Sequence, residues 1–286
     1  MRNRSHGVTL VELVVALTVT AVIATFSITL ISAPSVTLEA SNRRAGLASQ
    51  AAQSLLYVER DWRSALPNSV RFRNSAGVLA IEYLAVVDSA VLFRDLPAVP
   101  AGQRLTLGST DAQFETLGAF NQIAKPFDSA AMYMALHHTG AAGTNAWSLA
   151  DVITAPGTRV QIDAGSASGQ DRVSLTPATN FTSVGPSRRV YLLSGPVSYL
   201  CNPARGTLTR YAGYAIAANQ AARDSDGELM AAGATRSTLA TGVSNCRLAA
   251  TANASAAQTT HHLSVTFRSG TDQLLIGISR VGDNAG

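Results

Sequence analysis

The segment that decides the fold is the N-terminus, Met1–Ile31, which reads MRNRSHGVTLVELVVALTVTAVIATFSITLI. Two arginines, Arg2 and Arg4, precede a long apolar run whose one charge is Glu12. As a helix, residues 8–31 would be ~36 Å long, enough to cross a bilayer core of about 30 Å. Basic residues before the run favour a cytoplasmic N-terminus, with the rest of the chain on the other side of the membrane.

Two simpler interpretations explain less of this segment. A secretory signal peptide has a shorter apolar region, of about 7–15 residues, followed by a small-residue cleavage site. The stretch SITLISAPS offers a weak site of that kind. A plain signal anchor explains the length and orientation of the apolar run but does not explain the charged Glu12 within it. A carboxylate costs about 2.5–3.5 kcal/mol at mid-bilayer, and charged residues in such helices have partners.

The motif GVTLVE, Gly7–Glu12, with its basic leader and the apolar run after it, resembles the class III signal of type IV pilins and type II secretion pseudopilins. The resemblance implies that prepilin peptidase cuts between Gly7 and Val8 and N-methylates Val8, where the family usually has Phe. It also implies that other pilin or pseudopilin subunits are partners through the N-terminal helix, once that helix leaves the inner membrane.

Glu12 would be the fifth residue of the processed chain. A buried carboxylate is costly unless it is paired, and the helix stays in a low-dielectric setting when it moves from lipid to its neighbours. We therefore hypothesise that Glu12 steers assembly by pairing with the α-amine of a neighbouring subunit.

The helix is expected to extend past the membrane run. Pro34 should kink or interrupt it, because proline lacks an N–H and clashes with the preceding turn. Helical spacing then resumes until the helix stops near Ala65, before Pro67. An apolar stripe marks the face of this continuation that packs on a sheet: Leu47, Ala51, Leu55, Val58 and Trp62.

From Val70 onward the sequence predicts antiparallel strands and turns. Ser194-Gly195-Pro196 should separate two apolar strands, and the Ala- and Thr-rich stretch 248–260 should be a loop. Hairpins are expected at 70–83, through 202–206 and at 263–279. Short strands are also expected at 105–107, 114–117, 152–153 and 173–175.

The predicted fold class is thus α+β and pilin-like: a long N-terminal transmembrane and assembly helix packed on an antiparallel β-sheet domain. Its divisions are a leader over 1–7, a transmembrane and assembly helix over 8–33, an amphipathic continuation over 34–66 and a periplasmic β-rich domain over 67–286.

Three internal segments resemble a narrower group, the minor pseudopilin of MSHA (mannose-sensitive haemagglutinin) pilus biogenesis, MshO type. They are ALPNSVR (65–71), FETLG (114–118) and GPVSYLCNPARGTLTRYAGY (195–214). This resemblance implies a structural subunit at or near the tip of a type IV pilus, which primes or supports assembly. The alternatives are a J-type minor pseudopilin of a type II secretion system and a tip adhesin or DNA-binding minor pilin.

The β-rich domain contains two cysteines, Cys201 and Cys246. Their spacing excludes a C-x-x-C redox motif and a zinc finger. If the domain is periplasmic, a disulfide is expected. Two free thiols and a redox pair are the alternatives.

Candidate metal ligands are few. The pairs His137-His138 and His261-His262 make poor chelates, because neighbouring residues on a strand point to opposite faces, and we interpret them as loop or edge histidines. The segment DSDGE, Asp224–Glu228, contains half of a calcium-loop pattern without the distant Glu, so an Asp/Gly turn fits better. We expect no metal and no cofactor.

The composition excludes other classes of protein. A chain with 47% hydrophobic and 14% charged residues is not intrinsically disordered. The net charge of +4 falls to +2 when the leader takes Arg2 and Arg4 away, and the other arginines are scattered, which disfavours a nucleic-acid partner. Nucleophile-elbow, phosphate-loop, dinucleotide and H-E-x-x-H patterns do not occur, so no enzyme activity is expected.

Overall fold

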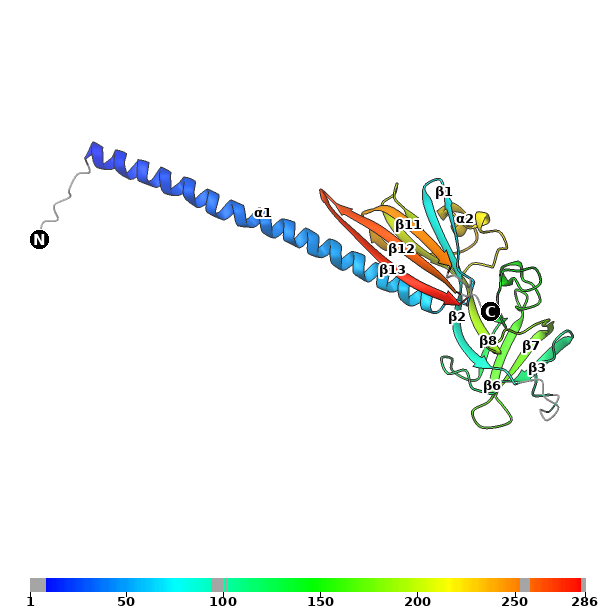
Figure 1. Ribbon diagram of the computed structural model, residues 1–286. Coiled ribbons are helices and arrows are strands. Elements are labelled where there is room, and N and C mark those ends of the chain that lie inside the picture. Colours follow the sequence, from blue (N-terminus) through cyan, green and yellow to red (C-terminus); the bar gives the residue numbers. More distant parts are fainter. Residues whose placement is uncertain (1–8, 94–99, 101, 253–257, 284–286) are drawn as a thin grey trace, which may run out of the picture. The chain divides into compact units, whose positions relative to one another are not determined.

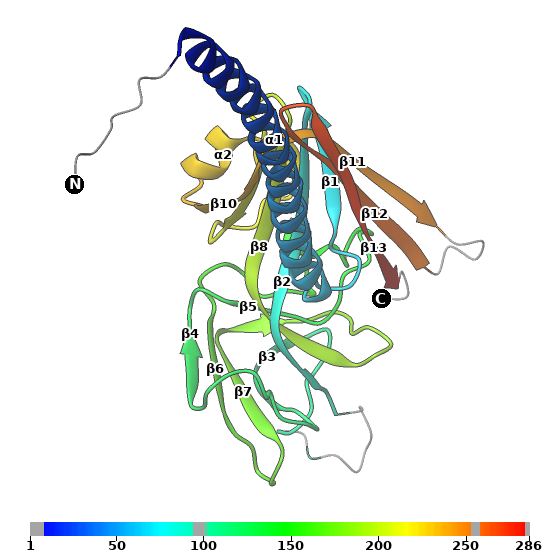
Figure 2. The same cartoon turned by 90° about the vertical axis from the view of Figure 1, so that its left-hand side faces the viewer.

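The computed structural model describes residues 9–93, 100, 102–252 and 258–283 and is drawn in Figures 1 and 2. Its first element is α1 (Leu10–Arg63), and the regular structure after that helix is mostly antiparallel strand, so the predicted α+β class is confirmed. The chain divides into two compact units, Met1–Ser49 and Gln50–Gly286. The last turns of α1 therefore belong to the β-rich unit.

The β-rich unit contains three antiparallel sheets. The central sheet has the order β1-β2-β8-β9-β10, with β5 also paired to β8. Its strands are β1 (Arg71–Ser75), β2 (Val78–Val91), β5 (Tyr133–Ala135), β8 (Arg189–Asn202), β9 (Thr207–Ala212) and β10 (Thr235–Thr241).

The second sheet has the order β3-β7-β6-β4, and the third has the order β11-β12-β13. Figures 1 and 2 place these two sheets toward opposite ends of the long pair β2 and β8. The second consists of β3 (Thr110–Glu115), β4 (Phe127–Ser129), β6 (Arg159–Ala164) and β7 (Asp171–Asn180). The third consists of β11 (Val243–Ala252), β12 (Gln258–Ser269) and β13 (Asp272–Asp283). Short helices complete the unit: η1 (Ala146–Ser148), η2 (Gln220–Ala222) and α2 (Asp226–Ala231).

All three predicted hairpins are present, as β1–β2, β8–β9 and β12–β13. The first turns at Ala76 and Gly77, which both have positive φ. The helix also ends close to the expected residue, at Arg63.

The predicted interruptions of regular structure are wrong, whereas a kink at Pro34 stays a prediction. α1 continues through Pro34, where the missing N–H and the steric clash cost about 3 kcal/mol and the turns on either side remain helical. β8 continues through Gly195, whose φ of +102° is accessible to glycine, and register shifts near Val86 accommodate the irregularity. Within the predicted loop 248–260, the described residues 248–252 and 258–260 belong to β11 and β12, because the register pairs Leu248 with Leu263 and gives the threonines ladder partners. Residues 253–257 lie outside the described residues.

Two short predicted strands do not form. Residues 105–107 are irregular, since the Thr106 N–H is bonded to the Asp111 carboxylate (2.9 Å) rather than to a neighbouring strand. At 152–153 the structure has an isolated bridge from Ile153 to Ala135. Residues 114–117 overlap the end of β3, and 173–175 lie within β7.

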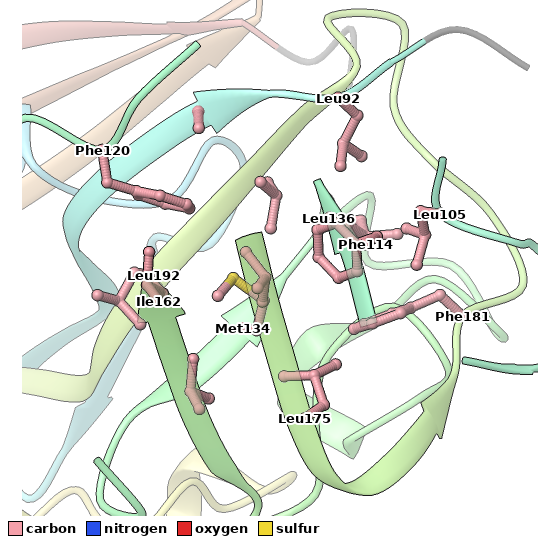
Figure 3. Packing of buried hydrophobic residues seen from close by; sticks show 14 residues of the cluster. Leu92, Leu105, Phe114, Phe120, Met134, Leu136, Ile162, Leu175, Phe181 and Leu192 are labelled. Atoms are coloured by element: carbon pink, nitrogen blue, oxygen red, sulfur yellow. The ribbon is translucent and has the colours of Figure 1, made fainter. Parts of the chain in front are cut away.

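A hydrophobic core lies between the second sheet and the distal part of β8, as Figure 3 shows. Leu192 of β8 and Met134 of β5 contribute from the central sheet, while Ile162 and Leu175 contribute from β6 and β7. The aromatic members Phe114, Phe120 and Phe181 fill the space around them. This core fixes the second sheet on the end of the central one.

The carboxylate of Asp61 connects the end of α1 to three strands of the central sheet. Its Oδ2 accepts hydrogen bonds from the Tyr199 hydroxyl (2.7 Å), the Tyr83 hydroxyl (3.1 Å) and the Arg210 Nε (2.7 Å). These donors come from β8, β2 and β9, so one oxygen binds three adjacent strands. Burial, together with the Asp61 charge, raises the pKa of both tyrosines, which keeps their hydroxyls protonated as donors.

Apolar packing and backbone bonds reinforce this attachment. Part of the predicted stripe is buried within the unit: Ala51, Leu55, Val58 and Trp62. Just after the helix, the Leu66 N–H donates to the Leu84 carbonyl (2.8 Å), and the Val86 N–H donates to the Ser64 carbonyl (2.7 Å). The chain leaving α1 is thereby joined to β2.

Substitution of Asp61 by Asn should lower the free energy of unfolding by about 2–3 kcal/mol, because the partly buried Arg210 loses its counter-ion. Urea unfolding of the full chain in detergent, followed by tryptophan fluorescence, measures the change. Asp128→Asn is the matched control, since Asp128 pairs with Arg159 on the surface, and exposed pairs contribute little. Equal unfolding midpoints for the two variants would contradict the anchoring role.

Candidate functional site

The first half of α1 is apolar and exposed. Within the described residues, Leu10–Ser27 is the stretch long and apolar enough to cross a membrane, with a mean hydropathy of 2.2 and no residue buried. At 1.5 Å per residue it spans ~27 Å, close to the hydrocarbon thickness of a bilayer. Its large exposed side chains include Leu13, Leu17, Ile23 and Phe26. An apolar surface of this kind requires lipid or other protein around it.

The hydroxyl groups in this stretch are compatible with such surroundings. Thr18 donates to the Val15 carbonyl at 2.9 Å, and Ser27 donates to the Ile23 carbonyl at 2.8 Å. Thr20 bonds back to the preceding turn in the same way. Each of these hydroxyls has a partner within its own helix, so it can enter a medium without water at little cost.

Glu12 lies in the first turn of α1 and is exposed. Its N–H donates to the Thr9 Oγ1 at 3.3 Å, and Thr9 directly precedes the first helical residue, in the capping position. A carboxylate in the first turn is also favoured by the helix dipole. Within the described part of the chain, the carboxylate itself has no ion-pair partner. Local structure thus orients Glu12, and none of the described residues pairs with its charge.

The predicted cleavage and methylation residues, Gly7 and Val8, lie outside the described residues. The two predicted disulfide partners are described and are joined. Cys201 of β8 and Cys246 of β11 form a disulfide with Cα atoms 6.3 Å apart, across a sequence separation of 45. The bond links the central sheet to the third sheet. Closing a loop of this length contributes roughly 4 kcal/mol in the chain-entropy account.

Among the described residues no group of three or more potential metal ligands occurs, so the structure does not bring the histidine pairs into such a group. His261 and His262 lie in β12, the middle strand of the third sheet, so their assignment to a loop or an edge is wrong. Both β11 and β13 pair with β12 at these positions, so neither residue lies at an edge of the sheet. His137 and His138 do lie in an irregular segment, but both are buried.

The acidic segment 224–228 begins a helix instead of forming a turn. Ser225 caps α2, and Glu228 completes a capping box by accepting from the Ser225 N–H. Asp224 pairs with Arg73 at 2.7 Å. Asp226 accepts from the Tyr211 hydroxyl (2.6 Å) and contacts two arginines, Arg205 and Arg236. The capping-box spacing S-x-x-E was present in the sequence, whereas the contacts of Asp226 depend on distant strands.

Comparison with known protein families finds a match at the N-terminus. The family described as "Prokaryotic N-terminal methylation motif" matches residues 2–28. No curated protein and no solved structure matches the chain. The matched range ends beside the end of the exposed apolar stretch of α1. The motif supports a class III signal and a membrane-anchored subunit of the pilin or pseudopilin type.

The buried His138 should make the stability of the β-rich unit depend on pH. Burial, assisted by the Arg71 and His137 charges, lowers the pKa of His138 from 6.5 to about 4. The unfolded chain therefore takes up a proton before the folded one does. The resulting stabilisation, about 3 kcal/mol, is complete above pH 6.5 and is lost as the pH falls to about 4.

His138→Asn should remove most of this pH dependence, because Asn does not titrate and can still accept the Ala146 N–H that the His138 Nδ1 now accepts at 3.1 Å. Urea unfolding at pH 7 and pH 4 measures the difference, with the exposed His262→Asn as control. An unchanged pH profile in His138→Asn would contradict the assignment.

Proposed function

We propose that this chain is a minor pilin or pseudopilin, a structural subunit of an extracytoplasmic fibre. It enters the bacterial inner membrane with its N-terminus in the cytoplasm, and prepilin peptidase cuts it between Gly7 and Val8 and methylates Val8. The observation that carries the proposal is the N-terminal methylation motif over 2–28, which coincides with an exposed helix of membrane length. The large antiparallel β-rich unit after the helix is what such a subunit requires.

Successive parts of the chain have different proposed roles. Residues 1–7 form the leader, 8–33 the transmembrane and assembly helix, and 34–66 its amphipathic continuation. Residues 67–286 form the periplasmic domain, for which the disulfide between Cys201 and Cys246 is suited, since disulfides persist in oxidising compartments. The cleavage reaction is performed on the chain and not by it.

Within the fibre we place the subunit at or near the tip of an MSHA-like type IV pilus, where it primes or supports assembly. Two features support this placement: the internal segments that resemble the MshO type, and the size of the β-rich unit. Three sheets and long loops suit a capping subunit better than a shaft, which is built from compact repeating subunits.

Mass spectrometry of the chain purified from cells that contain prepilin peptidase tests the class. The expected N-terminus is N-methylated Val8, and Gly7→Leu should leave the leader attached, because the peptidase requires a small residue before the cut. An intact Met1 in the wild-type chain would contradict the proposal and favour a plain signal anchor.

Glu12 is the residue we expect to control entry into the fibre. In the described residues its carboxylate is unpaired, and the first methylated residue of a neighbouring subunit carries a positive α-amine that could pair with it. A charge-assisted hydrogen bond of this kind is worth about 1.5–3 kcal/mol. Removing it should therefore reduce incorporation roughly tenfold or more.

Glu12→Val tests this role by comparing the amount of the subunit in sheared fibres with the amount in membranes. The variant should insert and be processed normally but be depleted from fibres. Glu39→Val, which removes the next acidic residue of α1, serves as the control and should assemble like wild type. Equal incorporation of both variants would rule out the pairing.

A further inference from the structure

The central sheet carries a pocket on the face that does not hold the end of α1. Side chains alternate between faces along a strand. Tyr199 and Arg210 point toward Asp61, so their neighbours Leu200, Thr209 and Tyr211 point to the opposite face. The last three residues line a pocket with a volume of about 350 Å³. This volume lies within the range of small-ligand sites.

The lining of the pocket is both polar and apolar, and it includes two arginines. Arg205 comes from the β8–β9 turn, where its N–H donates to the Asn202 Oδ1 at 3.0 Å and fixes the turn. Arg236 comes from β10, beside Tyr211 in the ladder. The Thr209 side chain contributes a hydroxyl, and Leu200 provides an apolar floor.

Both arginines contact the carboxylate of Asp226 and retain most of their hydrogen-bonding capacity. The Arg205 Nη1 lies 3.2 Å from the Asp226 Oδ2, and the Arg236 Nη1 lies 3.3 Å from the Asp226 Oδ1. The two arginine side chains are 65% and 53% exposed. A guanidinium has five N–H donors. Within the described part of the chain, Arg205 and Arg236 each make one side-chain hydrogen bond. Two positive groups thus share one negative group, which leaves a net positive charge.

We propose that this pocket binds a carboxylate from an acidic segment of a partner protein, with Arg205 and Arg236 as its ligands. Each guanidinium is a planar fork that can bind a carboxylate through two parallel N–H···O bonds, and two such groups line this pocket. A sugar acid has the same charge, but sugar rings commonly stack on an exposed aromatic face, and Tyr211 in this pocket is only 2% exposed. The inference is independent of how the N-terminus is processed.

Asp226 acts as an internal competitor for the arginines. It occupies one donor of each guanidinium, and its negative charge opposes an incoming carboxylate. An amide at this position would release the arginines while still accepting the Tyr211 hydroxyl. This arrangement distinguishes a binding site from a purely structural ion-pair cluster, because loss of Asp226 then improves binding.

Isothermal titration of the full chain in detergent micelles with a blocked tripeptide of aspartate and glutamate tests the proposal. Arg205→Gln and Arg236→Gln should each weaken binding about tenfold, and salt should weaken it in wild type. Asp226→Asn should strengthen binding several-fold. Arg159→Gln is the matched control, since Arg159 is also an exposed arginine paired with an aspartate, and it should leave binding unchanged.

Thermal melting of each variant first establishes that it is folded. The proposal is overturned if the tripeptide does not bind, if the folded arginine variants bind it as wild type does, or if Asp226→Asn weakens binding. It is also overturned if glucuronate binds more tightly than the tripeptide, because the ligand is then a sugar acid.

Discussion

The carboxylate of Asp61 joins the end of α1 to the central sheet of the β-rich unit. Asp61 lies at the end of a long helix, and its Oδ2 accepts bonds from three adjacent strands through Tyr83, Tyr199 and Arg210. A helix on a sheet packs mainly through apolar contact, which has little directional preference. The three hydrogen bonds add direction, because they are satisfied together at one position and rotation of the helix.

The two faces of the central sheet therefore differ. One face carries Tyr83 and Tyr199 and receives the end of α1. The other carries α2 and the pocket with Arg205 and Arg236. The pair β2 and β8 belongs to both faces and extends to the core around Phe114 and Leu192. A surface for ligands can therefore exist without disturbing the surface that holds the helix.

The first half of α1 differs from the β-rich unit, because no residue of its described stretch Leu10–Ser27 is buried. Its exposed apolar side chains, and the Glu12 carboxylate that has no ion-pair partner among the described residues, are unfavourable for a single chain in water. Lipid followed by the helices of other subunits would remove both costs, since the apolar surface stays buried and the carboxylate gains a counter-charge. Assembly of the proposed kind would therefore give this helix the surroundings that it lacks in a single chain.

Local sequence patterns determined the membrane-length helix, its methylation motif, the position of Glu12 and three hairpins, since each is set by neighbouring residues. Turn chemistry also predicted breaks at Pro34 and Gly195 that the structure does not have. The backbone hydrogen bonds of the rest of α1 and of β8 outweigh the local cost of the proline and of the glycine. The Asp61 contacts and the arginine pocket could not be predicted from the sequence. Their members lie on strands far apart in the chain, and only the register of the folded sheet brings those side chains to one face.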